Sequence, residues 1–398
     1  MEVVVSDRPP LHPDTLAIHG RSDDEGRPRD IAPALYPATT WRFESSAELE
    51  RHLRGEEVRL EYARYGSPTV REAELRLAAL EGAEDAILLG SGMAALSTAL
   101  LSLLGQGRHV VFTDDGYRPS RVLVEKVLSR FGVTWDVLPV DAPHRLMEVA
   151  RPGETRVVFT EFPTNPHLRL PDLGAWREAM RPLKGARLLV DSTLATPWNA
   201  RPLERGAHLV MHSVTKYLAG HNDLTAGVLA GASPLVEAIR EVRGLIGATA
   251  DPHAAWLLLR GLKTFPTRMA RHNASARWIA ERLLAHRTVE RVHCPGLPGQ
   301  PLPEGMSGVG GLVSFVVRGG RLAASRVIDE CRLIQHAASL GGPETLIQQP
   351  AVFSWSDLDD EALRARGLEP GLLRLSVGLE HPEDLWADLD RALNASAG

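Results

Sequence analysis

Between about residues 60 and 250 the chain repeats one pattern, in which short apolar runs alternate with segments of helical spacing. The apolar runs predict strands at 86–89, 109–113, 135–140, 156–160, 187–190, 208–211 and 226–230. Helical spacing predicts helices at 70–80, 93–104, 120–130 and 173–181. Short apolar strands separated by helices indicate a mostly parallel sheet covered on both faces. We therefore predict an α/β fold that binds its ligand beyond the carboxyl ends of the strands.

Changes in composition and in hydrophobic pattern divide the chain into three parts. Residues 1–58 are rich in proline, arginine and acids, which predicts an arm with a loop at 23–28 and a short helix near 46–54. Such an arm packs on a partner subunit or is a frayed terminus. Residues 59–249 hold the alternating pattern. Residues 250–398 predict a smaller α+β domain, with helices at 254–262, 270–286 and 385–393, strands at 308–317 and 373–377, and a loop at 339–350.

Composition argues against several classes of protein. The net charge is −5, so the chain has no overall basic field to attract nucleic acid. No apolar run approaches the roughly 20 residues that span a membrane, and residues 1–10 lack the apolar segment of a signal peptide. The two cysteines, Cys294 and Cys331, form no CxxC motif, and no HExxH motif occurs. We expect no membrane span, no disulfide framework, no metal and a cytoplasmic location.

Two residues at predicted strand ends suggest a cofactor. Lys216 follows the apolar run 208–212 and lies close to Ser213 and Thr215. A lysine in this setting can form a Schiff base with pyridoxal 5'-phosphate (PLP), whose phosphate the hydroxyl groups can bind. Asp191 ends another strand, where a carboxylate can pair with the protonated pyridine nitrogen. Each residue alone has a simpler explanation, because most lysines are exposed and an Asp here can cap the next turn.

Four more places could serve the same cofactor or its substrate. Residues 91–94 (Ser-Gly-Met-Ala) join a predicted strand to a predicted helix. The free N–H groups of the helix start could bind a phosphate, or the segment could be a plain turn. Tyr62 and Arg64 point to the same side of an extended segment, and they could bind a phosphate or be exposed residues without a ligand. Tyr117 follows a strand end and could stack on a planar ring or pack on a loop. Arg374 lies among apolar residues, so it needs a substrate carboxylate or an internal salt bridge.

Taken together and in order, these motifs resemble the Cys/Met-metabolism family of fold-type I PLP enzymes over nearly the whole chain. The resemblance is carried by Tyr62-x-Arg64 with Pro68-Thr69, Ser91-Gly92-Met93-Ala94, Tyr117, Glu161-x-Pro163-Thr164-Asn165-Pro166, Asp191-x-Thr193-x-Ala195-Thr196-Pro197, Ser213-x-Thr215-Lys216-Tyr217, Gly220-His221-x-Asp223, Ser339-Leu340-Gly341-Gly342 with Glu344, and Arg374-x-Ser376-x-Gly378-x-Glu380. Within the family the chain is most similar to the plant-like cystathionine γ-synthases, in the segments 61–66, 117–118, 221–223 and 349–357. Ser67, Phe162 and Ala337-Ala338 depart from the usual pattern.

The resemblance implies a fold-type I PLP-dependent transferase, with a seven-stranded sheet in a large domain and a smaller α+β domain. Lys216 would carry the cofactor and move protons, Asp191 would hold the pyridinium, and Tyr117 would stack on the ring. The implied cofactor-binding set also includes Ser91, Gly92, Met93, Asn165, Thr193, Ser213 and Thr215, together with Tyr62 and Arg64 from a neighbouring subunit. The implied substrate-binding set is Arg374 at the α-carboxylate, with Ser339, Asn165 and Glu61.

The reaction implied by the resemblance is γ-replacement in trans-sulfuration and methionine biosynthesis. An O-succinyl-, O-acetyl- or O-phospho-homoserine would lose its γ-substituent, and L-cysteine would add to give cystathionine. The alternatives are a cystathionine γ-lyase or β-lyase, a homoserine-ester sulfhydrylase, or a specialised enzyme that adds another nucleophile to a vinylglycine ketimine. A catalytically silent scaffold is the alternative from another class. The resemblance also implies small amino-acid substrates and a homotetramer whose active sites are shared across a dimer interface.

Overall fold

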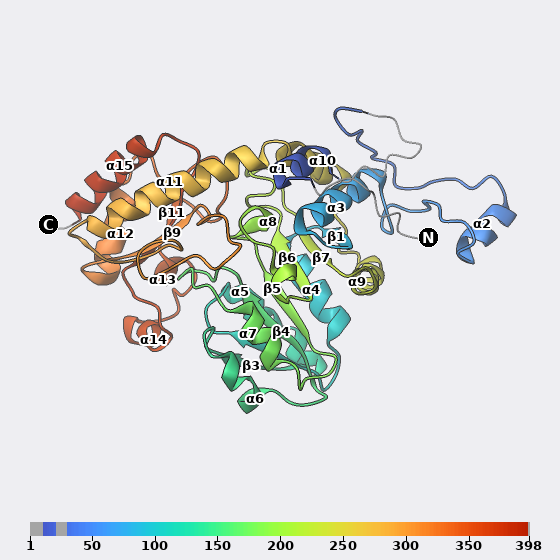
Figure 1. Cartoon of the computed structure of the whole chain (residues 1–398), viewed down its shortest axis with the longest axis horizontal. Helices are drawn as coiled ribbons and strands as arrows, with labels where there is room; N and C mark the ends of the chain where they lie inside the picture. Colours follow the sequence, from blue (N-terminus) through green and yellow to red (C-terminus); the bar gives the residue numbers. More distant parts are fainter. Residues whose placement is uncertain (1–10, 21–29, 397–398) are drawn as a thin grey trace.

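The computed structural model describes residues 11–20 and 30–396 and shows two sheets lying side by side. The larger sheet is formed by residues 85–231, and the smaller one, in orange and red in Figure 1, by residues 289–376. Helix α11 (Phe265–Ala285) runs from one part to the other along the top of the molecule in Figure 1. The loop predicted at 23–28 and residues 1–10 lie outside the described residues. The domain boundaries at 58 and 250 stay predictions.

The larger sheet has the strand order β1-β7-β6-β5-β4-β2-β3. Its strands are β1 (Asp85–Leu89), β2 (His109–Thr113), β3 (Thr134–Leu138), β4 (Thr155–Glu161), β5 (Arg187–Asp191), β6 (Leu209–Ser213) and β7 (Gly227–Gly231). Only β7 runs against its neighbours, so the expectation of a mostly parallel sheet is confirmed. Successive residues of β1 face opposite sides, since Leu88 and Leu89 are both fully buried but belong to different cores.

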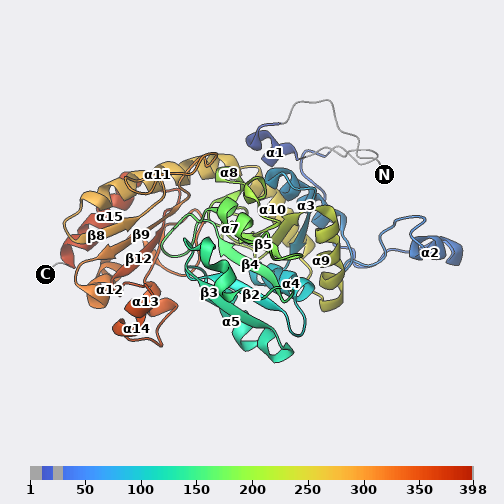
Figure 2. The same ribbon diagram turned by 60° about the horizontal axis from the view of Figure 1, so that its bottom comes forward.

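Helices cover both faces of this sheet, as Figure 2 shows from a second direction. One face carries α4 (Gly92–Leu103), α5 (Arg118–Lys126) and α9 (Ser233–Ile246). The other face carries α3 (Pro68–Glu81), α6 (Leu146–Val149), α7 (Leu173–Ala179), α8 (Thr196–Asn199) and α10 (Pro252–Leu262). The helix predicted at 120–130 ends earlier than expected, because α5 stops at Lys126 and a separate 3-10 turn, η1 (Leu128–Phe131), follows it.

The smaller sheet has the order β10-β11-β12-β9-β8. Its strands are β8 (Val289–His293), β9 (Leu312–Val317), β10 (Gln335–His336), β11 (Leu346–Gln348) and β12 (Leu372–Ser376). Helices α11, α12 (Gly320–Glu330) and α15 (Pro382–Ala395) pack on one face, and α13 (Pro350–Phe353) and α14 (Asp360–Ala365) on the other. The prediction of a loop over 339–350 was wrong in part, because that segment contains β11. Three residues are too few to show a strand period.

Residues 30–60, which precede α3, are largely exposed. Helix α1 (Pro13–His19) packs against the large core through the buried Ala17. Helix α2 (Ser46–Leu53) instead lies well away from the body of the molecule in Figures 1 and 2, and its Leu53 is 70% exposed. Of the helices within 11–20 and 30–396, none has the length and apolar character needed to cross a membrane.

Candidate active site

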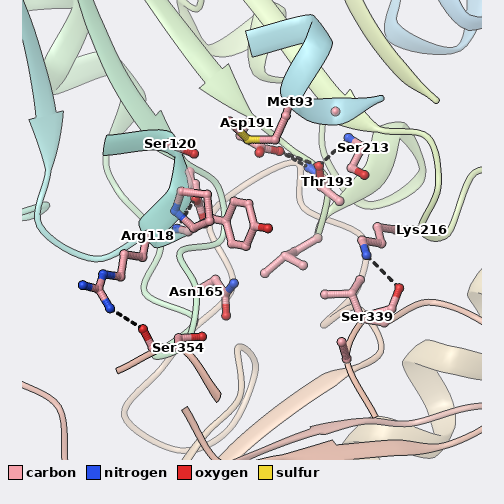
Figure 3. Close-up of a pocket in the computed structure, with 18 of the residues that line it drawn as sticks. Met93, Arg118, Ser120, Asn165, Asp191, Thr193, Ser213, Lys216, Ser339 and Ser354 are labelled. Carbon is pink, nitrogen blue, oxygen red and sulfur yellow. Dashed lines mark hydrogen bonds between the residues drawn. The ribbon is translucent and has the colours of Figure 1, made fainter. Parts of the chain in front are cut away.

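A cavity of about 620 Å³ lies where the large sheet faces the smaller one. The last residues of β4, β5 and β6, which are Glu161, Asp191 and Ser213, all reach it. The carboxyl ends of parallel strands therefore meet at one ligand-sized site, as expected for such a sheet. Figure 3 shows the side chains that converge there. All the predicted catalytic, cofactor-binding and substrate-binding residues line this cavity except Glu61, Tyr62 and Arg64.

Asp191 is held at the floor of the cavity by Thr193. Its Oδ1 accepts hydrogen bonds from the Thr193 backbone N–H at 2.9 Å and from the Thr193 hydroxyl at 2.5 Å. The same Thr193 Oγ1 accepts a hydrogen bond from the Ser213 backbone N–H at 2.8 Å. Burial raises the pKa of Asp191, although the hydrogen bonds from Thr193 oppose the shift. A buried carboxylate of this kind is stabilised by a cation placed against it, and a pyridinium nitrogen is such a cation.

The start of α4 forms a cradle for an anion. Ser91 caps the helix by accepting a hydrogen bond from the Ala94 backbone N–H at 3.0 Å. Gly92 follows, and a Cβ atom there would lie only 2.9 Å from the Cβ of Ser213. Glycine thus lets the first turn of α4 approach β6, with its free N–H groups at the cavity. Thr215 also lines the cavity, but its hydroxyl already pairs with the backbone N–H and carbonyl of Ala226.

We expect Gly92→Ala to weaken PLP binding at least about tenfold. The added methyl group must push Ser213 away, and overpacking of this kind costs about 1–3 kcal/mol. The Kd of PLP for the apoprotein, measured by titration of the visible absorbance, checks this. Gly105→Ala is the matched control, because a Cβ there meets no atom within 4 Å. Wild-type PLP affinity in Gly92→Ala would refute the role of Gly92 in bringing the start of α4 to the phosphate.

Lys216 points into the cavity and is held by Ser339. Its Nζ donates a hydrogen bond to the Ser339 hydroxyl at 2.7 Å, as Figure 3 shows. Ser339 has φ of 86°, a left-handed conformation that is rare outside glycine and often marks a functional site. Burial, followed by the positive charge of Arg374, lowers the pKa of Lys216 to about 8. The amine is therefore partly unprotonated, and so nucleophilic, near neutral pH.

This pKa predicts how fast the apoprotein takes up PLP. As the pH rises through about 8, Nζ loses its proton and its lone pair becomes available. Since only about one amine in ten is unprotonated one pH unit below the pKa, uptake near pH 7 should be about tenfold slower than at the plateau. Stopped-flow measurement of cofactor absorbance between pH 6.5 and 9.5 tests this. Free Nα-acetyl-lysine, with a pKa of about 10.4, is the control. A rate that keeps rising about tenfold per pH unit up to pH 9.5, without a plateau, would contradict the low pKa.

Arg374 is buried on β12, where its hydrogen bonds go to uncharged groups. It donates hydrogen bonds from Nη2 to the Ser339 carbonyl at 2.9 Å and from Nη1 to Asn165 Oδ1 at 3.3 Å. Its Nε is buried and has no hydrogen-bond partner within the described residues, and no Asp or Glu of that part lies within ion-pair distance. The sequence left open an internal salt bridge of Arg374, and the described residues form none with it. A buried guanidinium with an unpaired N–H is stabilised when it binds an anionic ligand.

Glu161 is a site residue that sequence reasoning did not include. It is buried, and its Oε1 accepts a hydrogen bond from the Tyr117 backbone N–H at 2.5 Å. Burial, together with the nearby charge of Asp191, raises the pKa of Glu161 well above its usual value. Glu161 therefore fixes the turn from which the Tyr117 ring reaches the cavity. The sequence carried a signal for this role, because Glu161, like Asp191, directly follows a predicted strand. The two residues are paired where β4 meets β5.

Arg118 links the two sides of the cavity mouth and was also missed as a site residue. Its guanidinium donates to both carboxylate oxygens of Asp357, at 2.9 and 3.0 Å, and to the Ser354 carbonyl at 2.6 Å. It also lies 4.3 Å from the centre of the Trp355 ring. These contacts join the start of α5 to the loop after α13, and sequence patterns cannot pair residues so far apart in the chain.

Glu61, Tyr62 and Arg64 lie outside the cavity of their own chain. Tyr62 is 45% exposed, and Arg64 donates a hydrogen bond to the Gly244 carbonyl at 3.1 Å. Glu61 forms an ion pair with His52 of α2 at 3.4 Å, in the projecting segment. Their contribution to a neighbouring subunit's site stays a prediction, since a single chain does not test it.

With this geometry in place, comparison with known proteins identifies the family. A family model described as Cys/Met metabolism PLP-dependent enzyme matches residues 14–394. The chain belongs to this family. The crystal structure of metB from Corynebacterium glutamicum has a TM-score of 0.88 and 33% identity, and the match covers 97% of this chain and 98% of that one. The expected family, fold class and PLP cofactor are thereby confirmed.

Individual relatives differ in their named activities. Cystathionine γ-synthase 1 of Arabidopsis thaliana is 39% identical over 369 residues, which cover 92% of this chain and 65% of that protein. L-methionine γ-lyase of Pseudomonas putida is 38% identical over 389 residues, which cover 96% of this chain and 97% of that protein. The family therefore establishes a PLP enzyme of γ-elimination or γ-replacement chemistry on amino acids. It does not choose between the two reactions.

The cavity fits PLP on its own evidence. The capped start of α4 offers N–H groups to a phosphate, and Asp191 offers a carboxylate to a pyridinium. Lys216 supplies an amine of lowered pKa, and Arg374 supplies an unpartnered donor for the carboxylate of an amino acid. These groups surround a single cavity, so cofactor and amino acid can occupy it together.

Proposed function

We propose that the protein joins L-cysteine to an activated homoserine ester to give cystathionine. The ester would carry an O-succinyl, O-acetyl or O-phospho group. The observation that carries the proposal is the cluster of Lys216, Ser339 and Arg374, in which a proton-carrying amine lies beside a carboxylate-binding guanidinium. The similarity to plant cystathionine γ-synthase is consistent with replacement. A cavity of about 620 Å³ is within the range of small-molecule sites and suits an adduct of two amino acids.

Within this proposal each side chain has a defined task. PLP, when bound, withdraws electrons from the attached amino acid and so stabilises negative charge on its carbon atoms. Lys216 Nζ takes and returns protons beside the cofactor, and a pKa of about 8 suits both directions near neutral pH. The Ser339 hydroxyl orients that amine, and its carbonyl orients Arg374. Arg374 holds the α-carboxylate together with Asn165.

The remaining predicted residues hold the cofactor in place. Ser91, Gly92 and Met93 surround the phosphate at the start of α4, and Ser213 completes that side. Asp191, fixed by Thr193, pairs with the pyridinium nitrogen. The Tyr117 ring packs on the cofactor ring, from a turn that Glu161 fixes.

We also propose that the active form is a homotetramer in which Tyr62 and Arg64 reach the cavity of a neighbouring copy. The exposure of Tyr62 and the projection of α2 away from the body support this, because such a segment is stabilised when it packs on another subunit. A cytoplasmic location stays a prediction.

Product analysis tests the proposed reaction. Purified holoenzyme is supplied with O-succinyl-, O-acetyl- or O-phospho-homoserine, with and without L-cysteine, and the products are identified by mass spectrometry. We expect cystathionine only when an ester and cysteine are both present. Sulfide accepted in preference to cysteine would indicate a sulfhydrylase instead. No turnover with any ester, in a protein that carries bound PLP, would refute the proposal.

A second candidate is γ-elimination, which the similarity to an L-methionine γ-lyase over nearly its full length favours. Elimination from L-methionine releases a thiol, ammonia and a 2-oxo acid without a second substrate. Incubation of the enzyme with L-methionine or cystathionine alone, followed by a colorimetric assay of the 2-oxo acid, distinguishes this activity. A faster rate there than with ester plus cysteine would favour the lyase.

A further inference from the structure

Three side chains from distant parts of the chain meet behind the loop that carries Asn165. His167 lies two residues beyond Asn165, His293 ends β8, and Glu369 comes just before β12. One potential ligand atom from each residue lies within 4.8 Å of the other two. The two imidazole rings are 5.2 Å apart between centroids and nearly perpendicular, at 77°. The cluster therefore joins the loop after β4 to the smaller sheet.

The atoms that face one another in this cluster lack partners. His167 Nε2, His293 Nε2 and Glu369 Oε2 are all buried, and none has a hydrogen-bond partner within residues 11–20 and 30–396. The separation of 3.5 Å between His167 Nε2 and Glu369 Oε2 is too long for a good hydrogen bond. Burying three unpaired polar atoms at one point is costly. One cation that accepts electron pairs from all three atoms would remove that cost.

The residues around the cluster prepare it for such a cation. His167 Nδ1 pairs with Asp115 Oδ1 at 2.9 Å, which leaves Nε2 as the ring atom that faces the cluster. Asp115 is itself held by Thr164 and Arg169, at 2.6 and 3.1 Å. A carboxylate behind a ligating histidine is a common feature of metal sites, because it fixes the tautomer and the ring orientation. Arg291 pairs with Glu369 Oε1 and leaves Oε2 facing the histidines.

We propose that His167, His293 and Glu369 bind a divalent transition-metal ion of the Zn²⁺ class. Two imidazoles and one carboxylate form a donor set that Zn²⁺ prefers, with a water molecule as the fourth ligand. Ligand distances of about 2.1 Å place tetrahedral ligand atoms about 3.4 Å apart. The widest separation, within 4.8 Å, must therefore shrink by at most about 1.4 Å, which side-chain rotations supply. The ion would tie the Asn165 loop to the smaller sheet.

This proposal departs from the expectation of no metal that the sequence suggested. That expectation rested on short ligand motifs, whereas these three residues come together only through the fold. The competing state is a protonated His167, with one N–H directed at Asp115 and the other at Glu369. Burial opposes that charge, but the two carboxylates beside the ring raise the pKa of His167 to about 9. A metal must displace this proton, so direct measurement of binding separates the two cases.

Titration calorimetry with Zn²⁺ tests the site. Tag-free holoenzyme is first dialysed against a chelator, and Mg²⁺ is titrated in parallel. We expect one Zn²⁺ per chain with a Kd of about 1 μM or tighter, a rise in the melting temperature, and no binding of Mg²⁺. The visible spectrum of the cofactor should not change, which distinguishes this site from chelation at PLP.

Variants assign the ligands. His293→Ala and Glu369→Gln should each weaken Zn²⁺ binding at least about tenfold and abolish the Zn²⁺-dependent rise in melting temperature. His336→Ala is the matched control, because His336 is an exposed histidine at the edge of the same sheet. Glu369→Gln preserves shape, so it remains informative if His293→Ala fails to fold. Absence of Zn²⁺ binding by the wild type, or equal binding by both ligand variants, would overturn the proposal. Neither outcome depends on which reaction the enzyme catalyses.

Discussion

Lys216→Ala should lower turnover by about 10³-fold or more while leaving the protein folded. The amine lies in the cavity, held by the Ser339 hydroxyl at 2.7 Å, and its pKa of about 8 lets it carry protons near neutral pH. Proton transfer by one positioned group contributes about 10²–10⁴-fold, and this residue also provides the covalent link to the cofactor. Turnover by the purified variant with an excess of added PLP is the measurement.

Lys184→Ala is the control for this experiment, because Lys184 is an exposed lysine just before β5 of the same sheet. We expect wild-type turnover from it. Circular dichroism and gel filtration should show the same fold and assembly for both variants, since among residues 11–20 and 30–396 the Lys216 side chain makes one hydrogen bond. Full activity in Lys216→Ala would remove the basis of the proposed mechanism.

The sequence predicted the large sheet well, for a physical reason. Apart from the edge strand β3, its strands are buried on both sides, so each appears as a short, mostly apolar run such as residues 86–89. The carboxyl ends of such strands meet at one edge, and this is why Asp191 and Lys216, far apart in the chain, could both be placed at a single site. The strand β8 was missed because it is partly exposed, and its consecutive polar residues Glu290 and Arg291 break the alternation that would indicate a strand.

Features that depend on tertiary structure could not be predicted in this way. The left-handed backbone at Ser339 lets one residue hold both Lys216 and Arg374, yet no local pattern marks it. The pairing of Arg118 with Asp357 and the meeting of His167 with His293 likewise arise only when the two sheets come together. The roles proposed for Tyr62 and Arg64 involve a second copy of the chain, and no pattern in one chain can place that copy.

Arg374→Ala should reduce kcat/KM for the amino-acid substrate by about 10²-fold or more. Two charge-assisted hydrogen bonds to a carboxylate contribute about 1.5–3 kcal/mol each, and each 1.4 kcal/mol is a tenfold change. The buried guanidinium has an unpartnered Nε, so it is prepared for this ligand. Arg374→Lys should recover little, because an ammonium group lacks the planar fork that binds a carboxylate through two donors. Steady-state kinetics with the preferred substrate provides the measurement.

The effect must be separated from a loosened cavity, since Arg374 also supports Ser339 and Asn165. Binding of an amino-acid inhibitor is therefore compared with binding of the corresponding amine, which lacks the carboxylate. The wild type should favour the amino acid strongly, and Arg374→Ala should lose that preference while its Kd for PLP stays within about threefold, less than 1 kcal/mol. Arg364→Ala, on the exposed face of α14, should behave like the wild type. If both ligands weaken equally in Arg374→Ala, the arginine supports the cavity wall and the carboxylate is bound elsewhere.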